Sequence, residues 1–302
     1  AMARISVDRK GEYVYTALQV VADNGGVLPS SEVVKQTEAR LDLNDYELER
    51  LEKSGYVRWY TYLHFNSVML TKAGWVRKEG GKWYITDEGL AALELGQEEF
   101  LKKGGAAYRS WKKQQNADSD ESEEIEDSEE FDDPDITRLL TYEQAESQAN
   151  EEIERFVTSL GPYEFQDLVA ALLRGMGYYT PFIAPRGKDG GVDVIAYQDP
   201  LGSIAPRIIV QVKQRQQKAS VQEIRELAGL LNRDGDNGLF VSTGGFTSDA
   251  GQEISRSVRH MEKMDLETFI RFWERHYESM EEADKALLPL QNIMFLAPAP
   301  LV

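Results

Sequence analysis

The chain contains no cysteine among its 302 residues. That absence excludes disulfides, cysteine-ligated zinc, iron–sulfur clusters and thiol catalysis, and it is typical of a reducing compartment. The sequence also lacks a run of roughly 18 apolar residues, which a membrane helix needs, and an apolar stretch near its start like that of a signal peptide. We therefore expect a cytoplasmic protein without membrane contact.

Basic residues are outnumbered, with 34 Lys and Arg against 52 Asp and Glu and a formal net charge of −18. This balance argues at first against a nucleic-acid partner, because phosphates call for basic surface. The excess is local, however. Residues 114–153 hold 16 acidic side chains and 1 basic one, whereas 1–113 and 154–302 carry net charges of +1 and −4. Two nearly balanced segments therefore flank an acidic one.

The charge pattern predicts three regions: a helical domain at 1–113, an acidic linker with a connecting helix at 114–153, and a second domain at 154–302. Residues 118–135 contain 12 acids and no base, so they bury too little surface to offset the entropy of ordering. We interpret them as a solvated linker, whose field decays over about 10 Å at moderate salt. The alternative is an acidic segment that mimics DNA and restrains the second domain.

The first domain shows helical patterns followed by a hairpin pattern. Helices are predicted over 12–22, from Ser30, from a cap at Asn44 to residue 54, and over 59–72. The sequence then alternates on either side of Gly80-Gly81, which predicts a hairpin over 75–85, and Thr86 can cap a closing helix. This order resembles a winged helix, in which one helix enters the major groove of DNA and the hairpin, or wing, contacts the backbone.

Four basic residues of this module are candidates for DNA contact. Lys72 lies near the end of the presumed recognition helix, and Arg77, Lys78 and Lys82 lie on the wing. The alternative is that these side chains are only solvated, and winged helices also bind proteins. Trp75 and Trp83, together with Tyr60 and Phe65, are interpreted as core residues rather than as platforms for base stacking.

In the second domain, an amphipathic helix begins at Phe165 and ends near Gly175. Two alternating segments follow, 187–197 and 207–214, with turn residues between them, which predicts an antiparallel hairpin. Opposing Asp193 to Gln211 centres that hairpin on Gly202. Strand alternation then puts Val192, Val194 and Ala196 on one face with residues 208, 210 and 212. The other face is left with Asp193, Gln211 and Lys213.

This trio has the composition of a phosphodiester-cleaving site. A carboxylate and an amide oxygen can ligate a hard cation such as Mg²⁺, which makes Asp193 and Gln211 candidate metal ligands. A lysine two residues along the strand can stabilise charge on a phosphoryl oxygen or lower the pKa of the attacking water. We therefore expect Asp193, Gln211 and Lys213 to be the catalytic residues.

The pattern Gly190-Gly191-Val192-Asp193 followed by Gln211-Val212-Lys213, after a helix ending in Gly175-Met176-Gly177-Tyr178, resembles the catalytic domain of Mrr-type restriction endonucleases, a branch of the PD-(D/E)xK nuclease superfamily. The likeness covers roughly residues 155–260, and the helical module resembles the Mrr N-terminal domain. It implies an α/β catalytic domain, a mixed central sheet flanked by helices, joined by the acidic linker to a winged-helix domain. It also implies Mg²⁺ as cofactor and hydrolysis of double-stranded DNA, often methylated.

One position departs from the family pattern. Members often carry a glutamate of the metal site on the first helix of this domain, where this chain has Gln166. Gln166 can still offer an oxygen to the metal, but it carries less negative charge, which puts a two-metal mechanism in doubt. Arg215 and Lys218, which follow the Lys213 strand, are further candidates for contact with phosphates.

These observations predict a Mg²⁺-dependent endonuclease of restriction or genome-defence type, type II or type IV-like, acting on double-stranded DNA. Cutting both strands needs two active sites or sequential nicking, so we expect a homodimer or higher homo-oligomer. Two alternatives stay open. One is a non-cleaving DNA-binding regulator with a decayed nuclease domain, and the other is a structure-selective, resolvase-like nuclease acting on branched DNA.

Overall fold

The computed structural model describes residues 5–52, 54–115, 134–187 and 190–296. The chain forms two compact units: unit 1 holds Ala1–Glu151 with Met294–Val302, and unit 2 holds Glu152–Ile293. Of residues 118–135, interpreted above as a solvated linker or a DNA mimic, 118–133 lie outside the described residues, whereas Pro134 and Asp135 begin a helix rather than continuing the linker. Among the described helices, none combines the length and apolar character needed to cross a bilayer.

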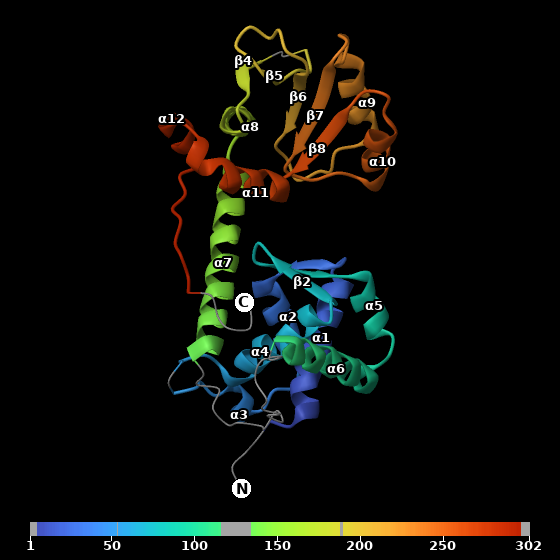
Figure 1. Cartoon of the computed structure of the whole chain (residues 1–302), viewed down its shortest axis with the longest axis vertical. Coiled ribbons are helices and arrows are strands. Elements are labelled where there is room, and N and C mark those ends of the chain that lie inside the picture. The colour runs from blue at the N-terminus through green and yellow to red at the C-terminus, as the bar shows by residue number, and fades with distance from the viewer. Residues whose placement is uncertain (1–4, 53, 116–133, 188–189, 297–302) are drawn as a thin grey trace. The chain divides into compact units, whose positions relative to one another are not determined.

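Unit 1 is a helical module with a small sheet (Figure 1). The sheet has the order β1-β3-β2 and is antiparallel throughout. Trp59, Trp83 and Phe100 lie in its core and are almost completely buried. The elements, in chain order, are α1 (Val7–Asp23), β1 (Val27–Pro29), α2 (Ser30–Arg40), α3 (Asp45–Leu48), α4 (Arg58–Lys72), β2 (Val76–Glu79), β3 (Lys82–Ile85), α5 (Asp87–Leu93), α6 (Gln97–Gln115) and the first part of α7 (Pro134–Ser159).

The expected helices and hairpin of unit 1 are present, with two differences of extent. Asn44 caps α3 through a capping box with Glu47, as predicted. The helix nevertheless ends at Leu48, because the next residue is extended and Arg50 forms a β-bridge with Val57. The helix expected from residue 12 begins five residues earlier, where the Ser6 hydroxyl accepts a hydrogen bond from the Arg9 amide.

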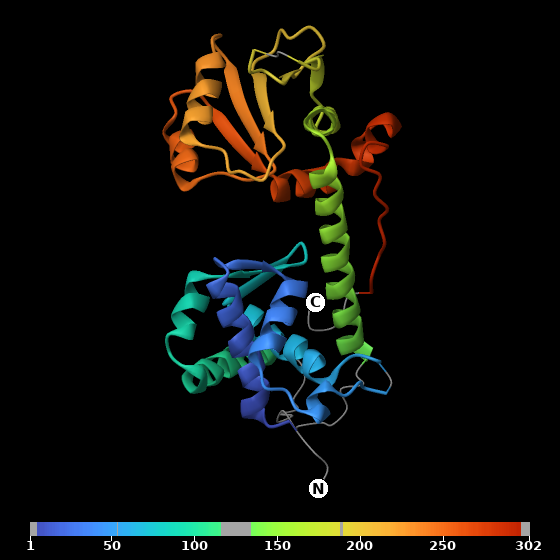
Figure 2. The ribbon, with the colours of Figure 1, turned by 180° about the vertical axis from the view of Figure 1, so that it is seen from behind.

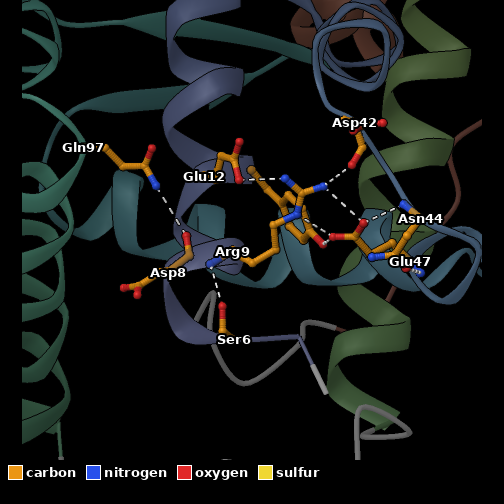
Figure 3. Close-up of polar contacts among 9 residues, drawn as sticks. Ser6, Asp8, Arg9, Glu12, Asp42, Asn44, Glu47 and Gln97 are labelled. Carbon is orange, nitrogen blue, oxygen red and sulfur yellow. Dashed lines mark hydrogen bonds and ion pairs between the residues drawn. The ribbon is translucent and has the colours of Figure 1, made fainter. Parts of the chain in front are cut away.

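A buried carboxylate joins α1 to α3 (Figure 3). The side chain of Glu47 is only 1% exposed and accepts hydrogen bonds from Arg9 Nε (2.6 Å), from the Tyr13 hydroxyl and from the Asn44 amide (2.8 Å). Burial by itself would raise the pKa of Glu47, but the hydrogen bonds from Arg9, Tyr13 and Asn44 outweigh it and lower the pKa to about 2. This hydrogen-bond network holds the first turns of α1 against the start of α3.

Unit 2 is a mixed five-stranded sheet with the order β4-β5-β6-β7-β8, in which β4, β5 and β6 are antiparallel and β6, β7 and β8 are parallel. Helices α8 and α11 pack on one face, and α9 and α10 on the other, as the two opposite views show (Figures 1 and 2). The elements are α8 (Pro162–Gly175), β4 (Tyr179–Ile183), β5 (Val194–Tyr197), β6 (Arg207–Lys213), α9 (Val221–Leu230), β7 (Asp236–Ser242), α10 (Ser248–Arg256), β8 (Met261–Asp265), α11 (Leu266–His276), the short 3-10 helix η1 (Tyr277–Ser279) and α12 (Glu282–Lys285).

The predicted α/β architecture is confirmed, and one element differs. Read alone, the apolar spacing from Met264 to Met280 is that of one amphipathic helix, but residues 261–265 form the edge strand β8 and the helix begins at Leu266. Met261 packs on the α9 and α10 side and Met264 on the α8 and α11 side, which is strand alternation. Strand β8 is only five residues long and rich in charged residues, so its sequence alone does not distinguish it from the first turn of a helix.

Candidate active site

The hairpin register predicted for β5 and β6 holds over most of its length. Val194 pairs with Val210, Ile195 with Ile209 and Ala196 with Ile208, which centres the hairpin on Gly202. Val194 and Val210 lie in the core under α8 and α11, whereas Ile195 and Ile209 belong to the cluster under α9 and α10. The pattern of alternation therefore predicted both faces correctly within the paired region.

The register breaks at Asp193, because the Asp193 amide donates to the carbonyl of Val210 (2.9 Å), the residue already paired with Val194. Two residues of this strand thus face one of β6, as in a β-bulge, a feature that often re-aims side chains beside active sites. The extra residue moves Val192 to the face under α9 and α10, so its predicted place beside Val194 was wrong.

The bulge places the carboxylate of Asp193 against β6. Its Oδ2 accepts a hydrogen bond from the backbone amide of Val212 (2.6 Å), and Asp193 as a whole is 6% exposed. A side chain thereby occupies the position of a carbonyl in the strand ladder and fixes the carboxylate against the next strand. The Asp193 carboxylate is consequently held next to the β6 segment that carries Gln211 and Lys213.

Gln211 is buried on the α9 and α10 side of the sheet, since it alternates with Ile209, which packs there. It is 5% exposed, and its Oε1 has no hydrogen-bond partner among the described residues. Gly191 lies nearby, since a Cβ added there would be in ordinary contact with Gln211 Nε2, at 3.4 Å. Lys213 follows two residues along the same strand and is half-buried.

Gln166 supports the segment that carries Asp193. It lies on α8, is 5% exposed, and donates through Nε2 to the carbonyl of Ala184 (2.8 Å). The Ala184 amide in turn donates to the carbonyl of Asp193 (2.8 Å). Two hydrogen bonds therefore link Gln166 to the backbone of Asp193.

The donor set fits one hard divalent cation. A buried amide oxygen without a partner on Gln211 and a buried carboxylate on the adjacent segment are oxygen ligands of the kind that Mg²⁺ takes while keeping several waters. Among the described residues, no three His, Cys, Asp or Glu side chains gather into a metal-binding group. Asp189, which precedes the bulge, lies outside the described residues.

Two loop residues were predicted to meet phosphates. Arg215 donates to both carboxylate oxygens of Glu223 (2.7 Å each), so it supports the start of α9. Lys218 is exposed at the end of the same loop. Lys218 is therefore the better placed of the two for a solvent-side contact.

In unit 1 the four candidate DNA-contacting residues differ in their surroundings. The Lys72 ammonium lies 4.1 Å from the Trp111 ring centroid, Arg77 is exposed and lies over Tyr84, and Lys82 is half-buried at the start of β3. Lys78 points elsewhere: its ammonium is 2.7 Å from Glu143 Oε1 on α7 and 2.8 Å from Ser67 Oγ.

Glu143 also bonds Nδ1 of the buried His64, a pairing that sequence analysis did not anticipate. Burial works against the charged form of Glu143, but Lys78 and His64 outweigh it and lower the pKa of the carboxyl to about 2. Burial lowers the pKa of His64 more than Glu143 raises it. The three residues lie up to 79 positions apart in the chain, so no local spacing pointed to them.

Comparison with known proteins assigns both units. A family model described as a restriction endonuclease matches residues 157–273, so the class defined by unit 2 is that of a restriction endonuclease domain, the domain of a DNA endonuclease. A second model, the Mrr N-terminal domain, matches residues 11–95 in unit 1. The chain thus carries a domain similar to the Mrr N-terminal domain, followed by a restriction endonuclease domain of the Mrr type.

Individual relatives are more distant. The uncharacterized protein y4cE of Sinorhizobium fredii (strain NBRC 101917 / NGR234) is 28% identical over 120 residues, which are 38% of this chain and 30% of that protein. The MspJI restriction endonuclease, solved in complex with a 27-mer oligonucleotide, is 16% identical with a TM-score of 0.36, over 51% of this chain and 36% of that one. The chain thus spans about a third of the length of these proteins.

Proposed function

We propose that this protein is a Mg²⁺-dependent endonuclease of restriction or genome-defence type, type II or type IV-like, that hydrolyses double-stranded DNA, including methylated DNA. The observation that supports the metal-dependent step is the unpartnered, buried Oε1 of Gln211, on the strand whose Val212 amide holds the Asp193 carboxylate. Asp193 and Gln211 would hold the cation, and Gln166 would position Asp193 through Ala184.

Residues of the chain itself would supply the other contributions to catalysis. Bound Mg²⁺ supplies positive charge at the phosphate and a more acidic water. The Val212 amide keeps the Asp193 carboxylate in a fixed orientation, which avoids reorganisation during the reaction. The Lys213 ammonium would orient the attacking water and offset negative charge that grows on the phosphoryl oxygens.

DNA would be recognised outside this centre as well. We propose Lys72, Arg77 and Lys82 of unit 1, and Lys218 of unit 2, as backbone contacts, because such positioning contacts come mainly from Lys and Arg. Lys78 and Arg215 are left out of this proposed interface, because Glu143 and Glu223 hold their charged groups at 2.7 Å, whereas the Arg77 side chain is 64% exposed and its contact with Glu79 is longer, at 3.4 Å.

The test is cleavage of plasmid DNA with Mg²⁺, with EDTA, and by the Lys213→Ala variant. Loss of a preorganised charge of this kind commonly costs about 10²- to 10³-fold in rate, so we expect that loss in Lys213→Ala with its unfolding midpoint and DNA binding unchanged. The control Lys102→Ala removes an exposed lysine of α6 and should cleave normally.

Three substrates separate the alternatives. Methylated plasmid, unmethylated plasmid and a four-way junction distinguish a methylation-dependent enzyme from a resolvase-like one. Binding without cleavage of all three by the wild-type protein would identify a non-cleaving regulator and contradict the proposal. Full cleavage by Lys213→Ala would remove Lys213 from the active site.

A further inference from the structure

Within the described part of unit 2, two buried side-chain oxygens have no hydrogen-bond partner. One is Oε1 of Gln211, discussed above, and the other is Oγ of Ser242, whose residue is 0% exposed. Buried polar atoms are nearly always paired, so an unpaired one calls for a reason such as a partner that binds there or a catalytic role. The position of Ser242 indicates which reason applies.

Ser242 is the last residue of β7 and pairs in parallel register with Lys213, the last residue of β6. Its side chain shares a face with Phe240, two residues earlier, which packs in the same cluster as Ile209. On β6 that face carries Ile209, then Gln211, then Lys213. The Ser242 hydroxyl therefore lies on the face of the candidate active site, directly beside Lys213.

The loops that leave these two strands are bonded to each other. The Thr243 amide donates to the carbonyl of Lys213 (3.0 Å), and the Ala219 amide donates to the carbonyl of Gly245 (2.9 Å). A β-bridge between Ala219 and Phe246 continues the contact. This pairing sets the backbones of Ser242 and Lys213 side by side where both strands end.

From this placement we infer that Ser242 is a positioning residue for Lys213, an inference that rests on the proposed nuclease function. A lysine ammonium can only donate hydrogen bonds, and a serine hydroxyl can accept one. In the complex with DNA and cation, Ser242 Oγ accepts a hydrogen bond from Lys213 Nζ and limits the rotamers of this long side chain. Ser242 does not itself contact the reacting atoms.

The test is Ser242→Ala, which removes only the hydroxyl. Removing an unpaired buried hydroxyl does not destabilise a core, so the unfolding midpoint of the metal-free protein should stay equal or rise. The maximal cleavage rate should fall about 10- to 100-fold, as it does when a supporting hydrogen bond of an active site is lost. The DNA concentration for half-maximal rate should stay unchanged, and Ser242→Thr, which restores the hydroxyl, should recover most of the rate.

A matched control is Thr37→Val. It removes another unpaired buried hydroxyl, that of Thr37 on α2 in unit 1, and should leave cleavage unchanged. The inference would be overturned if Ser242→Ala cleaved DNA at the wild-type rate. It would also be overturned if the cleavage rate of this variant fell together with its unfolding midpoint. If Lys213→Ala is inactive while Ser242→Ala is fully active, only the role of Ser242 fails. If Lys213→Ala is fully active, the proposed site itself fails.

Discussion

Glu47 in unit 1 and Asp193 in unit 2 are both buried carboxylates, but their hydrogen-bond partners differ. Glu47 is enclosed by donors from Arg9, Tyr13 and Asn44, so its hydrogen-bonding capacity is used within the fold. Asp193 is fixed by the Val212 amide, on the strand that also carries the unpartnered oxygen of Gln211. The first arrangement is structural, whereas the second offers oxygen ligands of the kind that Mg²⁺ takes.

The Glu47 network predicts a pH-dependent stability of unit 1. Its carboxyl has a pKa of about 2 in the folded protein, below its ordinary value of 4.5, so its stabilising effect is present above about pH 4.5 and is lost as the pH falls towards 2. Glu47→Gln removes the charge and should lower the free energy of unfolding of unit 1 by about 1–3 kcal/mol at pH 7. The difference from wild type should shrink in acid, as measured by denaturant unfolding between pH 7 and 3.

Glu12→Gln is the control for this variant, because Glu12 also bonds Arg9 (2.7 Å) but its side chain is 40% exposed. Exposed ion pairs contribute only about 0–1 kcal/mol, so this variant should remain close to wild type. An equal cost for both substitutions would show that burial of Glu47 has no special weight.

At the scale of elements, the turn of the wing is packed against α7. Gly81, between β2 and β3, has φ of +70°, and a Cβ added there would lie 2.5 Å from the Cα of Ser147 on α7. The wing strand β2 is joined to the same helix by the pair of Lys78 with Glu143. The hairpin proposed for DNA contact is thus also a docking site for the helix that follows the acidic segment.

This packing predicts different costs at the two glycines of the turn. Gly80 has φ of +57° and nothing within 4 Å of an added Cβ, so Gly80→Ala introduces only backbone strain, of order 1–2 kcal/mol. Gly81→Ala adds the clash with Ser147 and should cost at least about 1 kcal/mol more. Thermal unfolding of both variants measures the difference, and equal costs would mean that α7 does not pack on the turn in solution.

At the scale of the whole molecule, cutting both strands of a duplex sets a requirement on assembly. Each chain offers one candidate site in unit 2, so a double-strand break needs two chains or two successive nicks. We expect a homodimer on DNA, seen by light scattering, and a linearisation rate that rises more steeply than in proportion to protein concentration. A monomer with and without DNA, accumulating nicked plasmid first, would contradict this expectation.

Local patterns in the sequence determined much of this protein. Capping residues, alternation and turn residues report interactions among near neighbours, and these correctly predicted the Asn44 capping box, the hairpin centred on Gly202, and both faces of β5 and β6 within it. The motif residues Asp193, Gln211 and Lys213 were singled out from the same kind of local spacing, and their catalytic role stays a prediction.

Only the tertiary structure decided features that depend on partners distant in the chain. The register break at Asp193 accompanies a hydrogen bond from the Val212 amide, 19 residues away, to the Asp193 carboxylate, and Val192 packs on the face opposite to the predicted one. Lys78 acquired a partner 65 residues away, and Ser242 lies beside Lys213 through parallel strand pairing. Such pairings follow from how elements pack and from which buried polar groups remain to be satisfied, which no short window of sequence contains.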